Sequence, residues 1–312
     1  MKQSKPLSAD SRKKYLYRRL KESWPFYVML LPALIYIIIF CYGPMYGVQI
    51  AFKDYRTSKG IWGSPWVGLK HFVRFIEFPN FGKYLWNTLK INLISLATFP
   101  CAIIFSLMLN EVRNEKFKKV VQMVTYIPHF LTEVVVCALV ILFLDRNFGP
   151  IMAVVDLLGG ERTNLMTSAS AFPYIYVLSD LWQGLGWSTI LYMSALSAVS
   201  SEEVEAAKID GANRLQVVRH VYLPGIMPTI VINFIMRMGS LLGVGYSKIL
   251  LLQNDLNLDT STVLATYTYE IGLVGGQYSY SAAIGLFNNL VNIALLLVTN
   301  RIARSATETS LF

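Results

Sequence analysis

Apolar residues fill long stretches of the chain, and polar residues are concentrated in the segments between them. Crossing about 30 Å of hydrocarbon takes a helix of about 20 residues. Six stretches are long enough, at residues 26–50, 84–109, 120–144, 172–199, 226–252 and 281–302. Several contain prolines, which membrane helices tolerate where neighbouring helices satisfy the freed backbone groups. The pattern predicts an all-α, polytopic membrane protein with about six transmembrane helices.

The composition supports the same class. The 312 residues are 54% hydrophobic and only 15% charged, which is more apolar surface than one soluble core can bury. The net charge of +9 does not indicate a nucleic-acid partner, because the basic residues lie mainly in tails and loops beside the apolar stretches. Cys41, Cys101 and Cys137 lie within apolar stretches, so we expect no disulfide framework and no metal site. A multi-pass protein of the cell membrane, in contact with lipid, is expected.

The distribution of Lys and Arg predicts the orientation. Seventeen of them fall in the N-terminal tail, in every second connection and at the C-terminal end, against eight in the remaining connections. Cytoplasmic loops carry the excess of Lys and Arg, so both termini are expected in the cytoplasm. We therefore divide the chain into a basic cytoplasmic tail (1–24), a transmembrane domain (25–303) and a cytoplasmic C-terminal tail (304–312).

The outer connections differ from the inner ones. Residues 53–83 are rich in aromatic side chains and contain the sequence HFVRFIEF, whose apolar spacing predicts a short helix lying in the membrane interface. Residues 253–280 are polar, acidic and rich in Tyr, Thr and Gly. They suit either an extracytoplasmic partner or a solvated connector.

The longest polar interruption on the cytoplasmic side is residues 200–224, SSEEVEAAKIDGANRLQVVRHVYLP. Ser200 with Glu203 three residues later is a capping-box pattern that begins a helix. Gly211 is placed to end that helix in the left-handed conformation. A second short helix is expected over residues 212–221, stopped by Pro224 at the membrane boundary. The stretch predicts two short helices joined by a glycine turn.

This stretch resembles the EAA loop of ABC importer permeases. The matching positions are Glu205, Ala206, Ala207, Gly211, Val221, Leu223 and Pro224. The one departure, Val221 where the family has Ile, conserves side-chain character. The segments WVGLKHFVRF, LWNTLKI and YSAAIGLFNNLVNIALLLVTNRIAR also resemble LplB-type permeases for complex carbohydrates, and the resemblance extends over most of the chain from about Trp24 onward.

The resemblance implies a type I ABC importer permease that takes up oligosaccharides. Its partners would be a second homologous permease, two copies of a cytoplasmic ATPase and an extracytoplasmic solute-binding protein. The sequence contains no GxxxxGK[ST] motif, so ATP and magnesium are expected on the separate ATPase, with no cofactor on this chain. The residues expected to couple the permease to the ATPase are Glu205, Ala206, Ala207, Asp210, Gly211, Leu223 and Pro224.

Polar residues inside the apolar stretches are candidates for a substrate path, because they are costly in a membrane. The candidates are Asn233, Arg237, Asn288, Asn289 and Asn292. The alternative is hydrogen bonding between helices or with the partner permease. Arg237 lies too deep to reach the membrane surface, whereas Lys248 is placed to extend to the outer interface. A carboxylate would compensate Arg237, supplied either by an acidic, uronate-type oligosaccharide or by the partner permease.

Other functions have weaker sequence support. A permease of an ABC importer for another solute would share the EAA loop. His129 and Glu133, one helical turn apart, are the features that a proton-coupled secondary transporter would use, although pairing with a neighbouring group is the favoured explanation. An intramembrane enzyme would need a motif such as HExxH or GxSxG, and neither occurs.

Overall fold

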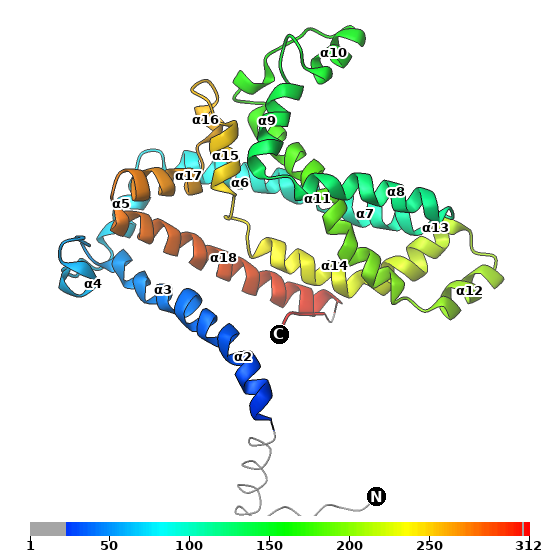
Figure 1. Cartoon of the computed structure of the whole chain (residues 1–312), viewed down its shortest axis with the longest axis horizontal. Helices are drawn as coiled ribbons and strands as arrows, with labels where there is room; N and C mark the ends of the chain where they lie inside the picture. The colour runs from blue at the N-terminus through cyan, green and yellow to red at the C-terminus, as the bar shows by residue number, and fades with distance from the viewer. Residues whose placement is uncertain (1–22, 308) are drawn as a thin grey trace, which may run out of the picture. The chain divides into compact units, whose positions relative to one another are not determined.

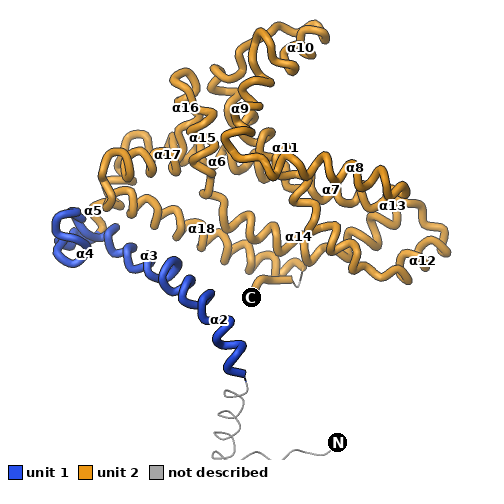
Figure 2. Tube along the Cα trace, viewed as in Figure 1, with its two compact units in different colours: residues 1–68 blue, residues 69–312 orange. Residues whose placement is uncertain are grey.

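The computed structural model describes residues 23–307 and 309–312. The predicted basic tail (1–24) therefore lies almost wholly outside the described residues. The described chain forms two compact units, which comprise residues up to Gly68 and from Leu69 onward (Figure 2). The regular structure of the described residues is helical, apart from an isolated bridge between Lys53 and Trp66.

The first unit is built around one apolar helical run. Four consecutive segments make up this run: α2 (Trp24–Tyr36), η1 (Ile37–Tyr42), α3 (Gly43–Met45) and η2 (Tyr46–Phe52). No residue of α2 is buried, and its exposed side chains are apolar on all sides. Such a helix suits a lipid environment, and the 29-residue run is long enough to cross a membrane. The short helix α4 (Gly60–Gly63) follows.

The second unit holds the remaining helices (Figure 1). The longer ones are α5 (Lys70–Ile76), α6 (Phe81–Ala97), α7 (Phe99–Asn110), α8 (Glu115–Tyr126), α9 (Glu133–Phe143), α10 (Pro150–Leu157), α11 (Phe172–Ser197), α12 (Ser201–Ile209), α14 (Leu223–Met238), α15 (Tyr246–Leu252) and α18 (Tyr278–Thr307). The short segments are η3 (Ile127–Phe130), η4 (Leu165–Thr167), α13 (Arg214–Val217), η5 (Val218–Tyr222), α16 (Leu258–Ser261), α17 (Leu264–Tyr269) and η6 (Glu270–Val274).

Helix α11 is the centre of this unit, because it packs against α6, α7, α8 and α14. One apolar cluster around Phe172, Ile91 and Ile249 joins α11 to α6 and α15. A second cluster around Tyr192, Ile103 and Ile226 joins α11 to α7 and α14. Helix α11 is therefore held on several sides and serves as a rigid frame for the side chains it carries.

Four helical runs are long and apolar enough to cross a membrane, or five if one bent pair counts as a single span. The four runs are Trp24–Phe52, Phe81–Asn110, Arg214–Met238 and Tyr278–Thr307. Helix α11 has 26 residues, which is enough to cross a membrane. Its polar and small side chains make it less hydrophobic than the four runs, so it is not counted among them. The structure therefore supports membrane-crossing helices at the first, second, fifth and sixth predicted stretches. It has one 26-residue helix at the fourth, and it changes the continuity of the third and the fifth.

The third predicted stretch (120–144) is not one continuous helix. Residues Glu115–Phe130 and Glu133–Phe143 meet at an angle of 106°. Pro128 occupies the last turn of the first piece, and the Thr132 hydroxyl accepts a hydrogen bond from the amide of Val135 to start the second. A proline and a new N-cap together explain the break.

The fifth predicted stretch (226–252) is also interrupted. Helix α14 ends at Met238, a loop follows, and α15 begins only at Tyr246. The helix also begins earlier than predicted, since Arg214–Met238 is one continuous helical run. Pro224 was predicted to stop a helix at this point, which is wrong. The amide of Leu223 bonds to the carbonyl of Val218 five residues back, and this wide turn accommodates a proline that lacks an N–H.

The interface helix predicted near His71 is present as α5. His71 and Phe75 are buried, however, and α5 packs against α18. Phe75 contacts Phe287 of α18 edge to face, with ring centroids 5.5 Å apart. This helix therefore contributes to the protein core of the second unit.

Candidate functional site

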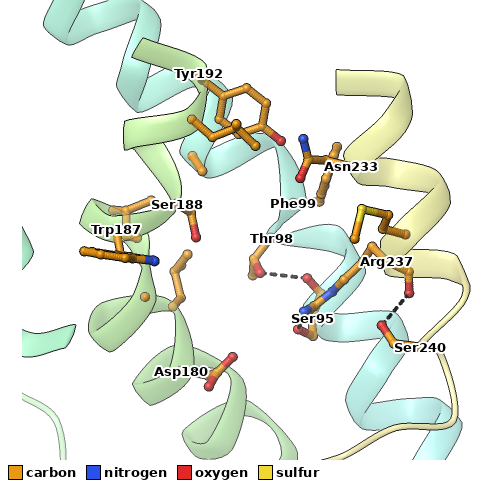
Figure 3. Close-up of a pocket in the computed structure, with 16 residues that line it drawn as sticks. Ser95, Thr98, Phe99, Asp180, Trp187, Ser188, Tyr192, Asn233, Arg237 and Ser240 are labelled. Carbon is orange, nitrogen blue, oxygen red and sulfur yellow. Dashed lines mark hydrogen bonds between the residues drawn. The ribbon is translucent and has the colours of Figure 1, made fainter. Parts of the chain in front are cut away.

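A cavity of about 620 Å³ lies between α6, α7, α11 and α14 in the second unit. Its two charged lining residues are Asp180 on α11 and Arg237 on α14 (Figure 3). Hydroxyl groups come from Ser95, Thr98 and Ser188. A cavity of this size that combines a few polar groups with apolar walls is typical of a small-molecule site.

The Arg237 side chain extends into this cavity from the last turn of α14 (Figure 3). Its Nη2 donates a hydrogen bond to Oγ of Ser95 on α6. Among the described residues this is the one partner that the guanidinium group has, and a guanidinium carries five N–H donors. Arg237 is itself exposed, so donors remain available to a bound molecule.

Aromatic side chains form a second feature of the cavity wall. Trp187 and Tyr192 extend from α11 and Phe99 from α7. The ring of His129 stacks on Trp187 with centroids 4.3 Å apart and planes at 7°. Trp187 is therefore held from behind by the segment between α8 and α9, and its orientation is fixed by that contact.

Two predicted path residues, Asn233 and Arg237, line the cavity together, one helical turn apart on α14. Asn233 donates from Nδ2 to the carbonyl of Thr229 at 2.8 Å. The asparagines of α18 lie outside the lining of this cavity. Asn292 accepts from the amide of Leu242 at 2.9 Å and holds the loop after α14.

The other two asparagines of α18 differ from each other. Asn289 is exposed, whereas Oδ1 of Asn288 is buried with no hydrogen-bond partner among the described residues. Asn288, Asn289 and Asn292 therefore all remain predicted path residues.

Several lining residues were not predicted from the sequence, and most are on α11. Asp180, Gly184, Ser188 and Tyr192 recur at a spacing of four and so share one helix face. A single carboxylate within the apolar stretch 172–199 is the signal in the sequence that could have identified this face.

Lys248 and Glu133 also differ from their predicted settings. Lys248 was predicted to extend to the outer interface, but it is only 2% exposed and its Nζ lies 3.4 Å from Oδ1 of Asp180. Glu133 does not share a helix with His129, because the bend separates them. Its Oε2 accepts a hydrogen bond from the Ser247 hydroxyl at 2.6 Å. The two residues predicted for a proton relay therefore contact different partners.

The second candidate site is the stretch 200–224, hereafter the EAA loop. The Ser200 hydroxyl accepts from the amide of Glu202 at 3.2 Å and begins α12 at the predicted place. The bond comes from Glu202 and not from Glu203, the residue of the predicted capping-box pattern. Gly211 has φ of 85°, and the helix ends in a Schellman motif in which the amide of Ala212 donates to the carbonyl of Ala207 at 2.9 Å. The predicted glycine turn is confirmed.

The next helix, α13, begins at Arg214, two residues later than predicted. Asn213 and Gln216 form a reciprocal capping box, with hydrogen bonds of 2.7 and 2.9 Å. Val204 and Val217 are buried beneath the loop. Helix α12 contacts α13 and η5. The EAA loop lies at one end of the second unit, away from α16 and α17 (Figure 1).

The outer surface of the EAA loop combines small, acidic and apolar side chains. Glu205 and Ala206 are exposed, and the apolar side chains of Ile209 and Leu215 are 86% and 75% exposed. Exposed apolar side chains on an otherwise polar loop favour contact with another protein.

A family model described as "Binding-protein-dependent transport system inner membrane component" matches residues 98–306, which include the EAA loop and the cavity lining apart from Ser95. The chain belongs to this family. Members are transport permeases of the membrane, so the chain is a membrane permease. The predicted resemblance to ABC importer permeases is confirmed.

Two relatives from Bacillus subtilis (strain 168) are similar along most of their length. The "Polygalacturonan/rhamnogalacturonan transport system permease protein YteP" is 40% identical over 97% of this chain and 94% of its own. "Protein LplB" is 39% identical over 94% of this chain and 92% of its own.

A solved structure has the same fold. It is described as a "bacterial ABC transporter involved in the import of the acidic polysaccharide alginate". One of its chains is 35% identical, with a TM-score of 0.85 and coverage of 94% of this chain and 99% of that one. A second structure of such a transporter is in complex with an "alginate pentasaccharide-bound periplasmic protein".

Proposed function

We propose that this chain is the permease subunit of an ATP-driven importer for acidic, uronate-type oligosaccharides. The observation that carries the proposal is the guanidinium group of Arg237, which faces a cavity of about 620 Å³ with hydrogen-bond donors available. A guanidinium group binds a carboxylate in a forked, two-bond geometry. The named cargoes of the YteP relative and of the alginate transporter support the proposal, because both contain uronic acids.

The rest of the cavity suits a sugar. Trp187 and Tyr192 offer apolar ring faces, and Ser188 and Asn233 offer hydrogen-bonding groups for hydroxyls. Asn288, Asn289 and Asn292 are proposed to extend this path along α18, toward a second permease.

The EAA loop is proposed to be the ATPase-binding site. Its coupling residues are Glu205, Ala206, Ala207, Asp210, Gly211, Leu223 and Pro224. ATP and magnesium would be held by two copies of an ABC ATPase, and closure of that dimer would move the loop as a rigid body. Since α13, η5 and α14 form one continuous run from Arg214 to Met238, motion of the loop would pass directly to Arg237.

The partners and topology follow from the same proposal. A second homologous permease would complete the transport path, and an extracytoplasmic binding protein would deliver the oligosaccharide. We propose six crossings with both termini in the cytoplasm, in which α8 with α9 and α14 with α15 each make one broken crossing. Broken helices are accepted in membranes where they are buried in protein or line a cavity.

The test is transport by the complete complex in proteoliposomes. Two oligosaccharides of equal length are compared, an oligogalacturonate and its neutral, carboxyl-reduced form. We expect ATP-dependent uptake with preference for the acidic sugar. Preference for the neutral sugar would overturn the assignment of an acidic cargo, and uptake driven by a proton gradient without the ATPase would overturn the importer mechanism.

A further inference from the structure

Lys248 is a buried cation placed directly behind the wall of the cavity. Its side chain is 3% exposed, and Nζ lies 3.4 Å from Oδ1 of Asp180 and 3.4 Å from Oε1 of Gln183. Nζ also lies 5.6 Å from the centre of the Tyr176 ring. Lys248 itself does not line the cavity, so no bound molecule is expected to touch it.

The Lys248–Asp180 pair is asymmetric. The Asp180 side chain is 49% exposed and lines the same cavity as Arg237, whereas its partner is enclosed in the protein. One carboxylate and one guanidinium group thus face the cavity, and they carry opposite formal charges. The enclosed ammonium group of Lys248 changes this balance to a net positive charge.

The other nearby carboxylate does not compete for this role. Glu133 on α9 accepts a hydrogen bond from Ser247. Its side chain is exposed and does not line the cavity. Among the described residues, the ion pair of Lys248 is with Asp180.

A purely mechanical role does not account for a lysine at this position. Helix α15 is already fixed by Ile249 and Leu252, which are 0% and 1% exposed and pack in the cluster around Phe172. A buried ion pair generally stabilises a fold no better than well-packed apolar side chains of similar volume. The charge of Lys248 therefore points to an electrostatic role.

We propose that Lys248 is a specificity-determining residue, which neutralises Asp180 from behind the cavity wall and leaves Arg237 as the unopposed charge toward the cargo. The inference rests on the proposed import of an acidic oligosaccharide. Gln183 supports the arrangement, because its Nε2 donates to the carbonyl of Leu131 at 3.2 Å and so orients Oε1 toward Lys248. Without Lys248, the Asp180 carboxylate would repel a carboxylate of the cargo.

The test uses the complete complex in proteoliposomes and the ratio of acidic to neutral oligosaccharide uptake at equal chain length. Lys248→Met is expected to lower this ratio about tenfold or more, since an unpaired like charge then faces the cargo. Lys248→Arg retains the charge and is expected to keep the ratio. The double variant Asp180→Asn with Lys248→Met removes both charges and is expected to restore the ratio to within about threefold of the wild type.

The outcomes separate this inference from the proposed function. Equal loss of acidic and neutral uptake in Lys248→Met would show that the lysine only holds α15 in place. Failure of the double variant to restore the ratio would also overturn the inference. A wild-type complex that prefers the neutral sugar would overturn the proposed cargo first, and this inference with it.

Discussion

The guanidinium group of Arg237 donates a hydrogen bond to the hydroxyl of Ser95, a residue 142 positions earlier in the chain. The bond joins α14 to the end of α6 across the wall of the cavity. Ser95 is itself held, because the Thr98 hydroxyl donates to its carbonyl at 2.8 Å. Arg237 is thus oriented by a hydroxyl group rather than neutralised by a carboxylate, and its charge remains available to a cargo.

Removing the charge of Arg237 should weaken import of an acidic oligosaccharide. We expect Arg237→Gln to raise the KM for the acidic sugar by about tenfold or more, because a charge-assisted hydrogen bond contributes about 1.5–3 kcal/mol. Ser95→Ala should raise the KM by only about fivefold, since the charge stays and one orienting bond is lost. Initial uptake rates in proteoliposomes measure both.

The matched control for Ser95 is Ser197→Ala. Ser197 lies on α11 and donates its hydroxyl hydrogen bond to the carbonyl of Met193 at 2.9 Å, but it does not line the cavity. This variant should transport as the wild type does. If Arg237→Gln changed the KM of the neutral sugar as much as that of the acidic one, the guanidinium group would not distinguish the two sugars by their charge.

Substitution of Gly211 should uncouple the EAA loop from the ATPase. Gly211→Ala places a side chain at φ of 85°, where an L residue costs roughly 1–2 kcal/mol, although no atom stands in the way of the new Cβ. We expect lower cargo-stimulated ATP hydrolysis. Combined with Glu205→Ala, it should abolish association with the ATPase while membrane insertion is normal, as measured by co-purification.

Gly159 provides the control for backbone strain. It has φ of 81° with open space around the position of a Cβ, and it lies in the loop after α10. Gly159→Ala therefore carries the same strain at a site outside the EAA loop. Equal loss of ATP hydrolysis in both variants would contradict a specific coupling role for Gly211.

The local signals of the EAA loop could be predicted from the sequence, whereas the cavity could not. Ser200 begins α12 and Gly211 ends it, and each does so through hydrogen bonds or backbone angles within a few residues. Such local roles can be predicted from the sequence. The cavity depends on which helices pack together. The spacing of Asp180 and Ser188 defines a face of α11. Spacing within one helix does not predict which other helix packs against it, so the position of Arg237 on the same cavity could not be predicted.

The two wrong helix predictions have the same physical origin. Apolar content predicts membrane stretches but does not report a break inside them. In the third stretch the break occurs between Pro128 and Thr132, and in the fifth it follows Met238. Lys248 was misplaced for a related reason, since a helix that restarts after a loop points its side chains in new directions.

The contact between α8 and α11 should depend on the absence of a side chain at Gly186. A Cβ at this position would lie 2.2 Å from the carbonyl oxygen of Thr125, which is backbone and cannot rotate away. We expect Gly186→Ala to lower the melting temperature in detergent by several degrees, as overpacking typically costs about 1–3 kcal/mol.

Gly184 on the same helix is the control for helix propensity. A Cβ there would meet no atom within 4 Å. Gly184→Ala gains the same intrinsic helix propensity and should leave the melting temperature unchanged or raise it slightly. Equal destabilisation by the two alanines would show that the close approach to Thr125 is not limiting.

The proposed topology makes opposite predictions for four exposed positions. Arg113 and Lys208 lie in connections expected in the cytoplasm, whereas Glu161 and Asp255 lie in connections expected outside. After replacement of Cys41, Cys101 and Cys137, each position is changed to cysteine in turn and treated with a membrane-impermeant thiol reagent in intact cells. Glu161→Cys and Asp255→Cys should react, and Arg113→Cys and Lys208→Cys should react only after lysis.

The pair Lys208 and Asp255 tests the broken crossing, because the run from α14 to α15 separates these two positions. Reaction of both from the same side would mean that this run enters the membrane and returns, and the number of crossings would then fall below six.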